Sequence, residues 1–388
     1  MTGKSRLAEA KAVMARLIAI DSVSDASNLP VVDFVEAYLD SHGLKARRAP
    51  NAAGDKAAIL ATIGPAVDGG VVLSGHTDVV PADGQPWSSP PFSLRQAAGR
   101  LYGRGACDMK GFDACVLAMA PAFRDAGLKR PVHIVLSYDE ETTCLGSRDI
   151  IARFGKDEPS PAAVIVGEPT MMQVADAHKS VATFRTLVIG REAHSALPAL
   201  GANAVAVAAD IVSEIGRLAR LYEAGPLDPR FTPPYSTLHV GMIRGGTARN
   251  ILARECAFHW EFRGLPGVAT ASAMAKVQAF VDEVATPRLT RFVSGPSIAT
   301  TIEVDVPPLA AAPGSAAERL ALRLGRSNQT IAVSFATEAG HFQAAGLPTI
   351  VCGPGSIDQA HKPDEFVDEA QLVACLDFLE RLAEDLSR

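Results

Sequence analysis

The stretch VVLSGHTDVVP, residues 71–81, is an apolar run typical of a buried strand, and it ends with His76 and Asp78. Buried strands seldom end with two titratable side chains so close together, because each ionisable group must be hydrated or paired. Three further runs share its apolar, non-alternating character: residues 56–64, 131–137 and 162–167. Together they predict a parallel or mixed sheet whose strands are buried on both faces and covered by helices.

Helical spacing alternates with these strands and predicts an α/β fold. It occurs up to about residue 20 and at residues 29–42, 111–127 and 316–324, and it returns at the end of the chain. Between residues 179 and 308 the order changes to β-α-β-β-α-β, which is typical of a ferredoxin-like unit with two helices on an antiparallel sheet. We therefore predict one α/β domain in two parts, residues 1–178 and 309–388, and an inserted domain at residues 179–308.

Composition limits the class of protein. A chain of 388 residues exceeds the usual size of one core, which favours two domains. The formal charge of −6 and the lack of a basic stripe argue against a nucleic-acid partner. No secretory signal and no membrane-spanning run is recognisable, so we predict no membrane partner. The six cysteines are scattered without paired spacing, which predicts reduced thiols in the cytoplasm and no cysteine ligand for zinc.

Titratable side chains follow several of the predicted α/β strands or precede a helix. They are His76, Asp78, Asp108, Asp139, Glu140, Glu141, Glu168 and His361. In open α/β sheets, ligands bind outside the carboxyl ends of the strands, so these side chains are expected to meet at one edge. A lone histidine at a strand end, or one acidic turn, is usually only a solvated polar group. In this sequence, titratable groups of this kind follow several strands, and their recurrence favours a functional site.

A cluster of so many carboxylates requires a cation, because the negative charges repel one another. Histidine and carboxylate ligands without cysteine suit zinc or cobalt in a hydrolytic site. Two ions that share a carboxylate would form a two-metal clamp. We therefore predict two divalent metal ions, zinc or alternatively cobalt.

The sequence resembles the dinuclear-zinc aminoacylase and carboxypeptidase family over nearly its whole length. The motifs that carry the resemblance are SGHTDVVP (74–81), GRLYGRGACDMKGF (99–112), SYDEET (137–142), VGEPT (166–170), GREAHSALP (190–198) and GPGSIDQAHKPDEFV (353–367). The resemblance implies a zinc-peptidase-like α/β/α catalytic domain and an inserted dimerisation domain. It also implies metal-dependent hydrolysis of an N-acylated amino acid. A non-catalytic homologue that only binds metal is the alternative from another class.

The resemblance implies a role for each residue at the strand ends. Asp108 would bridge the two ions, with a cis peptide bond after it. The remaining ligands would be His76 and Glu168 for one ion, and Glu141 and His361 for the other. Glu140 would be the general base that takes a proton from the attacking water. Asp78 would fix the tautomer of His76.

Three further residues match family positions with less certain roles, and a fourth, Glu338, lies where several relatives have Ser-Asp and this chain has Thr337–Glu338. His194 would reach the active site of the partner subunit in a homodimer, or else cap the following helix. Asn250 and Arg263 would contact substrate, and a guanidinium suits a carboxylate; alternatively they are ordinary polar residues of strands. Glu338 would pair with the side-chain ammonium of a cationic substrate, or else have a structural role such as fixing a loop N-terminus.

Overall fold

The computed structural model describes residues 3–295 and 297–388, and the chain forms two compact units. Unit 1 comprises the chain up to Ala177 together with Ala311–Ala332 and Thr337–Arg388. Unit 2 comprises His178–Ala310 and Val333–Ala336. These divisions lie close to the domain boundaries predicted at residues 178 and 308.

Unit 1 is built on an eight-stranded sheet in the order β1-β2-β6-β3-β7-β14-β8-β13. Its strands are β1 (Ala46–Pro50), β2 (Ala57–Ile63), β3 (Gly70–His76), β6 (Val132–Ser137), β7 (Pro161–Pro169), β8 (Ala175–His178), β13 (Ile331–Val333) and β14 (Thr349–Gly353). β3 runs parallel to both β6 and β7, and β14 runs parallel to β7, whereas β1, β2 and β6 pair antiparallel. The sheet is therefore mixed. The parallel strands bring their carboxyl ends to one edge.

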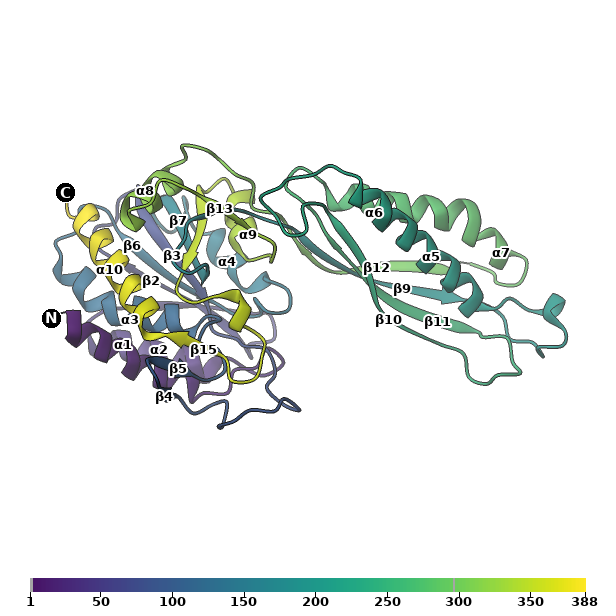
Figure 1. The fold of residues 1–388 in the computed structure, drawn as a ribbon, viewed down its shortest axis with the longest axis horizontal. Helices are drawn as coiled ribbons and strands as arrows, with labels where there is room; N and C mark the ends of the chain where they lie inside the picture. Colours follow the sequence, from purple (N-terminus) through teal and green to yellow (C-terminus); the bar gives the residue numbers. More distant parts are fainter. Residues whose placement is uncertain (1–2, 296) are drawn as a thin grey trace. The chain divides into compact units, whose positions relative to one another are not determined.

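The central strands are hydrophobic throughout because both faces are covered. Every residue of β3 and β6 is buried. Five helices contribute apolar side chains to one core with this sheet: α1 (Gly3–Ile18), α2 (Leu29–Ser41), α3 (Lys110–Asp125), α8 (Ala316–Gly325) and α10 (Glu369–Leu386). Figure 1 shows α1, α3 and α10 side by side, and α3 contacts both of the others. The prediction of an α/β fold with a covered mixed sheet is confirmed.

Smaller elements complete unit 1. They are α4 (Arg148–Ile151), α9 (Ala339–Ala344) and a three-stranded sheet of β15 (Phe366–Asp368), β5 (Arg100–Tyr102) and β4 (Arg95–Ala97). α9 contacts β7, β14 and α4. The short strands were not predicted, because three residues carry too little periodicity to be recognised.

Unit 2 has the predicted β-α-β-β-α-β order. Its elements are β9 (Val181–Ile189), α5 (Ala204–Glu223), β10 (Thr237–Gly245), β11 (Glu255–Arg263), α6 (Thr270–Phe280) with a π-helical extension (Val281–Ala285), α7 (Pro287–Thr290) and β12 (Ile298–Val306). The sheet is antiparallel in the order β10-β11-β9-β12. β9 alternates between buried and half-buried residues, so one face of the sheet packs on the helices.

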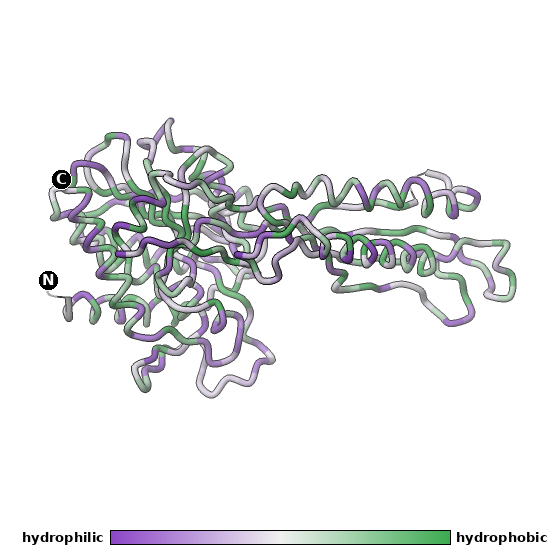
Figure 2. Tube along the Cα trace, turned by 45° about the horizontal axis from the view of Figure 1, so that its top comes forward, coloured by the Kyte–Doolittle hydropathy of each residue, from purple (hydrophilic) through white to green (hydrophobic). Residues whose placement is uncertain are grey.

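The long helix α5 shows why this sequence folds locally as it does. The side chain of Asn203 accepts hydrogen bonds from the backbone N–H groups of Val205 and Ala206, which caps the first turn. Buried residues then recur at three- and four-residue spacing, including Val207, Ile211 and several further on. In Figure 2 the helices of unit 2 accordingly alternate between hydrophobic and hydrophilic residues.

Within the described residues, no helix has the length and hydrophobicity needed to span a membrane.

Candidate metal centre

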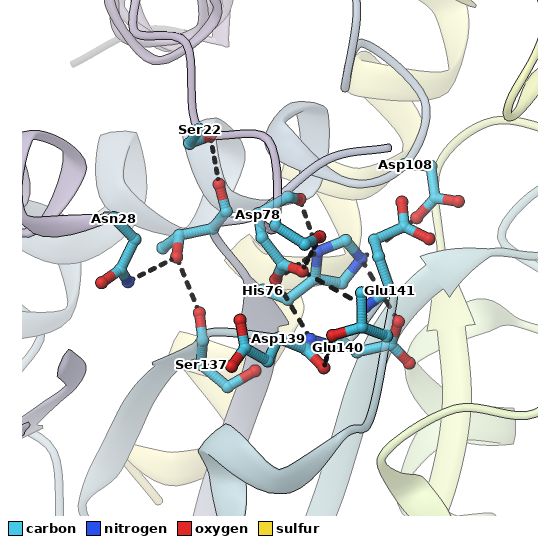
Figure 3. A network of polar contacts seen from close by, with 12 residues as sticks. Ser22, Asn28, His76, Asp78, Asp108, Ser137, Asp139, Glu140 and Glu141 are labelled. Atoms are coloured by element: carbon cyan, nitrogen blue, oxygen red, sulfur yellow. Dashed lines mark hydrogen bonds and ion pairs between the residues drawn. The ribbon is translucent and has the colours of Figure 1, made fainter. Parts of the chain in front are cut away.

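His76, at the end of β3, faces a cluster of carboxylates. The side chain is buried. Its Nε2 lies 3.1 Å from Asp108 Oδ1 and 3.7 Å from Glu168 Oε1. Its Nδ1 lies 2.9 Å from the backbone oxygen of Asp78, which leaves Nε2 as the atom directed at the cluster (Figure 3). These contacts group His76, Asp108 and Glu168 as possible ligands of one ion.

Asp108 stands between two histidines that are far apart in sequence. It lies in the loop before α3, and the peptide bond after it is cis, as the family resemblance implied. One carboxylate oxygen faces His76, and the other lies 3.2 Å from Nε2 of His361. Burial opposes ionisation of Asp108, but hydrogen bonds to His361 and His76 outweigh it and hold the pKa below its usual value.

A second group of possible ligands shares this aspartate. His361 Nε2 lies 3.0 Å from Glu141 Oε2, and the candidate atoms of Asp108, Glu141 and His361 lie within 4.8 Å of one another. The candidate atoms of the first group satisfy the same limit. Two ligand groups joined by one carboxylate are the arrangement expected of a two-metal site.

The site has the chemical properties of a cation-binding site. Glu141 Oε1 and Glu168 Oε1 are buried and have no hydrogen-bond partner in the structure. Burial raises the pKa of Glu141 to about 7, and the nearby charge of Asp108 adds to this effect. Burial and then Glu140 raise the pKa of Glu168 well above its usual value. A divalent cation would supply the partner that these oxygens lack, so the donor set fits two metal ions.

Glu140 lies beside both ligand groups but belongs to neither. Its Oε2 is 3.9 Å from His76 Nε2, and its side chain is only 9% exposed. Burial raises the pKa of Glu140 to about 8. A carboxylate with a pKa near neutrality, placed beside the ligands, can accept and return a proton.

The carboxylate of Asp78 lies beside His76 and also accepts hydrogen bonds from the acidic turn. It lies 3.6 Å from His76 Nδ1, farther than its own backbone oxygen, so the backbone is the nearer partner of the histidine. The carboxylate accepts hydrogen bonds from Ser24 Oγ at 2.7 Å and from the backbone N–H groups of Glu140 and Glu141 at 3.2 and 3.3 Å (Figure 3). Asp78 therefore holds the turn that carries the base and one ligand.

The placement of Glu338 favours its structural alternative over a contact with substrate. Its side chain is buried at the start of α9. One carboxylate oxygen accepts a hydrogen bond from Ser74 Oγ at 2.6 Å, and the other from Ser137 Oγ at 2.8 Å. Both oxygens are thus occupied inside unit 1. Glu338 joins α9 to β3 and β6, the strands that precede His76 and the acidic turn.

Three predicted residues belong to unit 2. His194 is exposed, and its Nδ1 accepts a hydrogen bond from the N–H of Ala196 at 3.1 Å. Asn250 is also exposed, and its backbone oxygen accepts a hydrogen bond from the N–H of Ser195 at 3.0 Å. These two residues therefore lie on neighbouring segments. Arg263, at the end of β11, is paired with Glu261 at 2.7 Å.

Sequence reasoning missed Arg104 and Glu365, which form a buried ion pair at 2.8 Å beside Asp108. Glu365 closes the motif that contains His361, and Arg104 stands in the motif of Asp108. Their presence in both metal-ligand motifs was a usable signal.

The metal-free protein is expected to lose stability as the pH rises from about 6.5 to 8. The pKa values of Glu140, Glu141 and His361 are raised to about 8, 7 and 10. Burial is the main cause for both glutamates, and hydrogen bonds to Asp108 and Glu141 are the cause for the histidine. In this pH range the folded state binds more protons than the unfolded state, so the free energy of unfolding falls as pH rises. The two buried glutamates account for about 2 kcal/mol of this fall, and His361, whose side chain is 52% exposed, adds less because solvent screens its charge.

Thermal unfolding in a chelating buffer at both pH values measures this effect. Saturating zinc should largely abolish the pH dependence, because bound ligands no longer titrate and the nearby cations favour the ionised form of Glu140. A midpoint that is unchanged or higher at pH 8 without metal would contradict the prediction.

Comparisons with known proteins agree with the geometry. Residues 72–385 match the family model "Peptidase family M20/M25/M40". The chain is 33% identical over 373 residues to an acetylornithine deacetylase of Proteus mirabilis, covering 95% of this chain and 92% of that one. It is 34% identical over 379 residues to an acetylornithine deacetylase of Myxococcus xanthus, covering 94% of each.

Solved structures with the same fold are more distant in sequence. The M20 family metallo-carboxypeptidase Sso-CP2 of Sulfolobus solfataricus has a TM-score of 0.77 at 17% identity, covering 98% of this chain and 99% of that chain. The Bacillus subtilis YXEP protein, described as a dinuclear metal-binding peptidase, has a TM-score of 0.68 at 16% identity, covering 99% of each chain. Fold and site together define a hydrolase with two groups of possible metal ligands. The chain belongs to peptidase family M20/M25/M40.

Proposed function

We propose that this protein is a two-metal amidohydrolase that converts N2-acetyl-L-ornithine to L-ornithine and acetate, a step of arginine biosynthesis. The observation that carries the reaction class is the pair of ligand groups sharing Asp108, with Glu140 beside them. The choice of substrate is supported by relatives named acetylornithine deacetylase at 33–34% identity over most of the chain.

The proposed mechanism assigns proton transfer to Glu140. Two divalent ions, zinc or alternatively cobalt, would be held by the two ligand groups; when bound, they supply a Lewis acid for the amide carbonyl and acidify a water. Glu140 takes the proton of the attacking water and returns it to the leaving amine. Asp78 keeps Glu140 in place through the backbone of the acidic turn. No covalent acyl-enzyme is required.

We also propose a homodimer formed through unit 2. β10 is an edge strand, and its residues from His239 onward are largely exposed. Met242 and Ile243 on this strand and the nearby Ile251 are each at least 40% exposed, and exposed apolar groups of this kind mark interaction surfaces. In this dimer His194 would serve the site of the partner subunit.

Substrate contacts are proposed for Asn250 and Arg263, which would bind the polar ends of the acylated amino acid. Arg263 is half-buried and has a carboxylate partner in Glu261, so a substrate carboxylate would compete with this pair. A cytoplasmic location is proposed from the cysteines, since all six are free and buried.

A second candidate is the same chemistry on another acylated amino acid, such as succinyl-diaminopimelate, acetylcitrulline or a peptide. The fold also occurs in proteins named as peptidases, such as human carnosine dipeptidase 1, with a TM-score of 0.74 at 16% identity. The metal centre acts on the amide group that all these substrates share. The metal centre therefore supports the reaction class more strongly than it supports a particular amino-acid side chain on the substrate.

Hydrolysis rates across these substrates test the proposal. With zinc or cobalt present, kcat/KM for N2-acetyl-L-ornithine is expected to exceed that for each other substrate by at least about 10-fold, since 1.4 kcal/mol of differential binding gives that ratio. A higher value for another acylated amino acid would transfer the assignment to that substrate. Stoichiometric metal binding without hydrolysis of any of them would favour a non-catalytic homologue.

A further inference from the structure

Glu365 binds the backbone of the loop that carries Asp108. Its carboxylate is buried immediately before β15. Oε1 accepts hydrogen bonds from the N–H groups of Cys107 at 2.8 Å and Asp108 at 3.1 Å. Oε2 accepts from the N–H of Gly105 at 3.0 Å and from Arg104 Nη1 at 2.8 Å. One carboxylate thus satisfies three backbone donors of the loop, which fixes the backbone orientation of Asp108.

Arg104 extends this connection to two more loops. Its Nη2 donates to the backbone oxygen of Pro81, at 3.1 Å, and to Gln85 Oε1, at 2.6 Å. Gln85 in turn donates from Nε2 to the backbone oxygen of His361 at 3.1 Å. The Arg104–Glu365 pair therefore joins the segment after His76, the loop of Asp108 and the loop of His361.

The loop of His361 needs such outside support. His361 has φ +62° and Asp364 has φ +56°, values in the left-handed region that residues other than glycine seldom adopt. Asp364 is held by Ser88, whose N–H and Oγ donate to its carboxylate at 3.0 and 2.8 Å. A backbone of this kind persists where surrounding contacts determine it. Those contacts come from the segment that Arg104 also binds.

We propose that the Arg104–Glu365 pair is a positioning device for the metal centre, and that it sets the affinity for the ion held by Asp108, Glu141 and His361. This inference rests on the proposed two-metal site. Two of the three ligands of that ion lie on loops joined by the pair. The other ion would be held by His76, Asp108 and Glu168. Of these three residues, only Asp108 lies on a loop that the pair joins. Loss of the pair therefore affects the two ions unequally.

Glu365→Gln is the informative variant. It keeps the size of the side chain and one carbonyl acceptor. It replaces the other acceptor with an amide N–H₂, which cannot accept a hydrogen bond. Residues that orient metal ligands without touching the metal typically contribute about 10–100-fold to metal affinity. We expect a loss of this size for the ion held by Asp108, Glu141 and His361. The ion held by His76, Asp108 and Glu168 shares only Asp108 with the loops that the pair joins, so its affinity should fall by less than about ten-fold.

Glu158→Gln is the matched control. Glu158 is also a buried glutamate paired with an arginine, Arg47, at 2.8 Å. It precedes β7, whereas the metal centre lies at the carboxyl end of that strand. Its replacement should lower thermal stability in the metal-free state while both zinc affinities stay within about three-fold of wild type.

Isothermal titration of the metal-free full-length protein with zinc gives the two affinities directly, and thermal unfolding of the same samples gives stability. Raising the zinc concentration should restore kcat of Glu365→Gln to within about three-fold of wild type, because the chemistry itself is intact. Glu141→Ala removes a ligand of one ion only, so a variant that already carries this change shows which ion Glu365→Gln affects. Adding Glu365→Gln there should weaken the binding of the remaining ion, held by His76, Asp108 and Glu168, by less than about ten-fold.

Two other outcomes would overturn the inference. If wild type binds two ions and Glu365→Gln binds both as tightly, or loses both equally, Glu365 has no selective positioning role, and the proposed function stands. If wild type binds no zinc, the proposed metal centre fails, and this inference fails with it.

Discussion

Glu140→Gln is expected to lower kcat by about 10²–10⁴-fold while both metal ions remain bound. Glutamine has the shape of glutamate but cannot accept a proton, so it removes general-base catalysis, which contributes about this factor. Glu140 is not a member of either ligand group, and its amide hydrogen bond to Asp78 comes from the backbone, so the turn is preserved. Steady-state kinetics with zinc analysis of the same preparations measures both effects.

Asp139→Asn is the matched control for this experiment. Asp139 is in the same turn, but its carboxylate pairs with Lys56 and lies in neither ligand group. Its φ of +57° is a conformation that asparagine also tolerates. We expect kcat to change by less than about three-fold. If Glu140→Gln retained more than a tenth of wild-type kcat with two ions bound, proton transfer would have to be assigned to another group.

The positions of the possible metal ligands were predictable because they depend on strand ends. His76 and Glu168 end apolar runs that the sequence marks clearly, and parallel pairing brings such ends together. The ferredoxin-like order of unit 2 was predictable for a similar reason, since β9 alternates along its whole length and α5 has a regular apolar stripe. In both cases the hydrophobic pattern that supports the prediction lies within a single helix or strand.

Contacts between distant segments were less predictable. Glu338 was interpreted as a substrate ligand or a structural residue, and its two serine partners lie 264 and 201 positions away. The carboxylate of Asp78 stays a predicted partner of His76, at 3.6 Å, but its hydrogen bonds to Ser24 and to the backbone of the acidic turn had no signal in the sequence. Glu365 received no role, because its partners become visible only when the loop of Asp108 is folded beside it. Such contacts require the tertiary arrangement.

Asp108→Asn is expected to weaken binding of both ions by more than about 100-fold and to lower hydrolysis by at least about 10³-fold. Asp108 is the only residue common to both ligand groups, and it presents one oxygen to each histidine. Residues that merely orient ligands contribute about 10–100-fold to affinity, so loss of a shared ligand exceeds that range. Loss of the metals removes several kcal/mol of transition-state stabilisation, and each 1.36 kcal/mol corresponds to a tenfold rate.

Asp113→Asn separates loss of a ligand from loss of a buried charge. Asp113 is also buried, lies five positions further on in α3, and belongs to neither ligand group. Burial raises its pKa well above the usual value, so an uncharged asparagine changes little there. Zinc titration should give two ions for Asp113→Asn and fewer than two for Asp108→Asn. If Asp108→Asn still bound two ions with wild-type affinity, the shared carboxylate would not bridge them, and the two ligand groups would have to bind their ions independently.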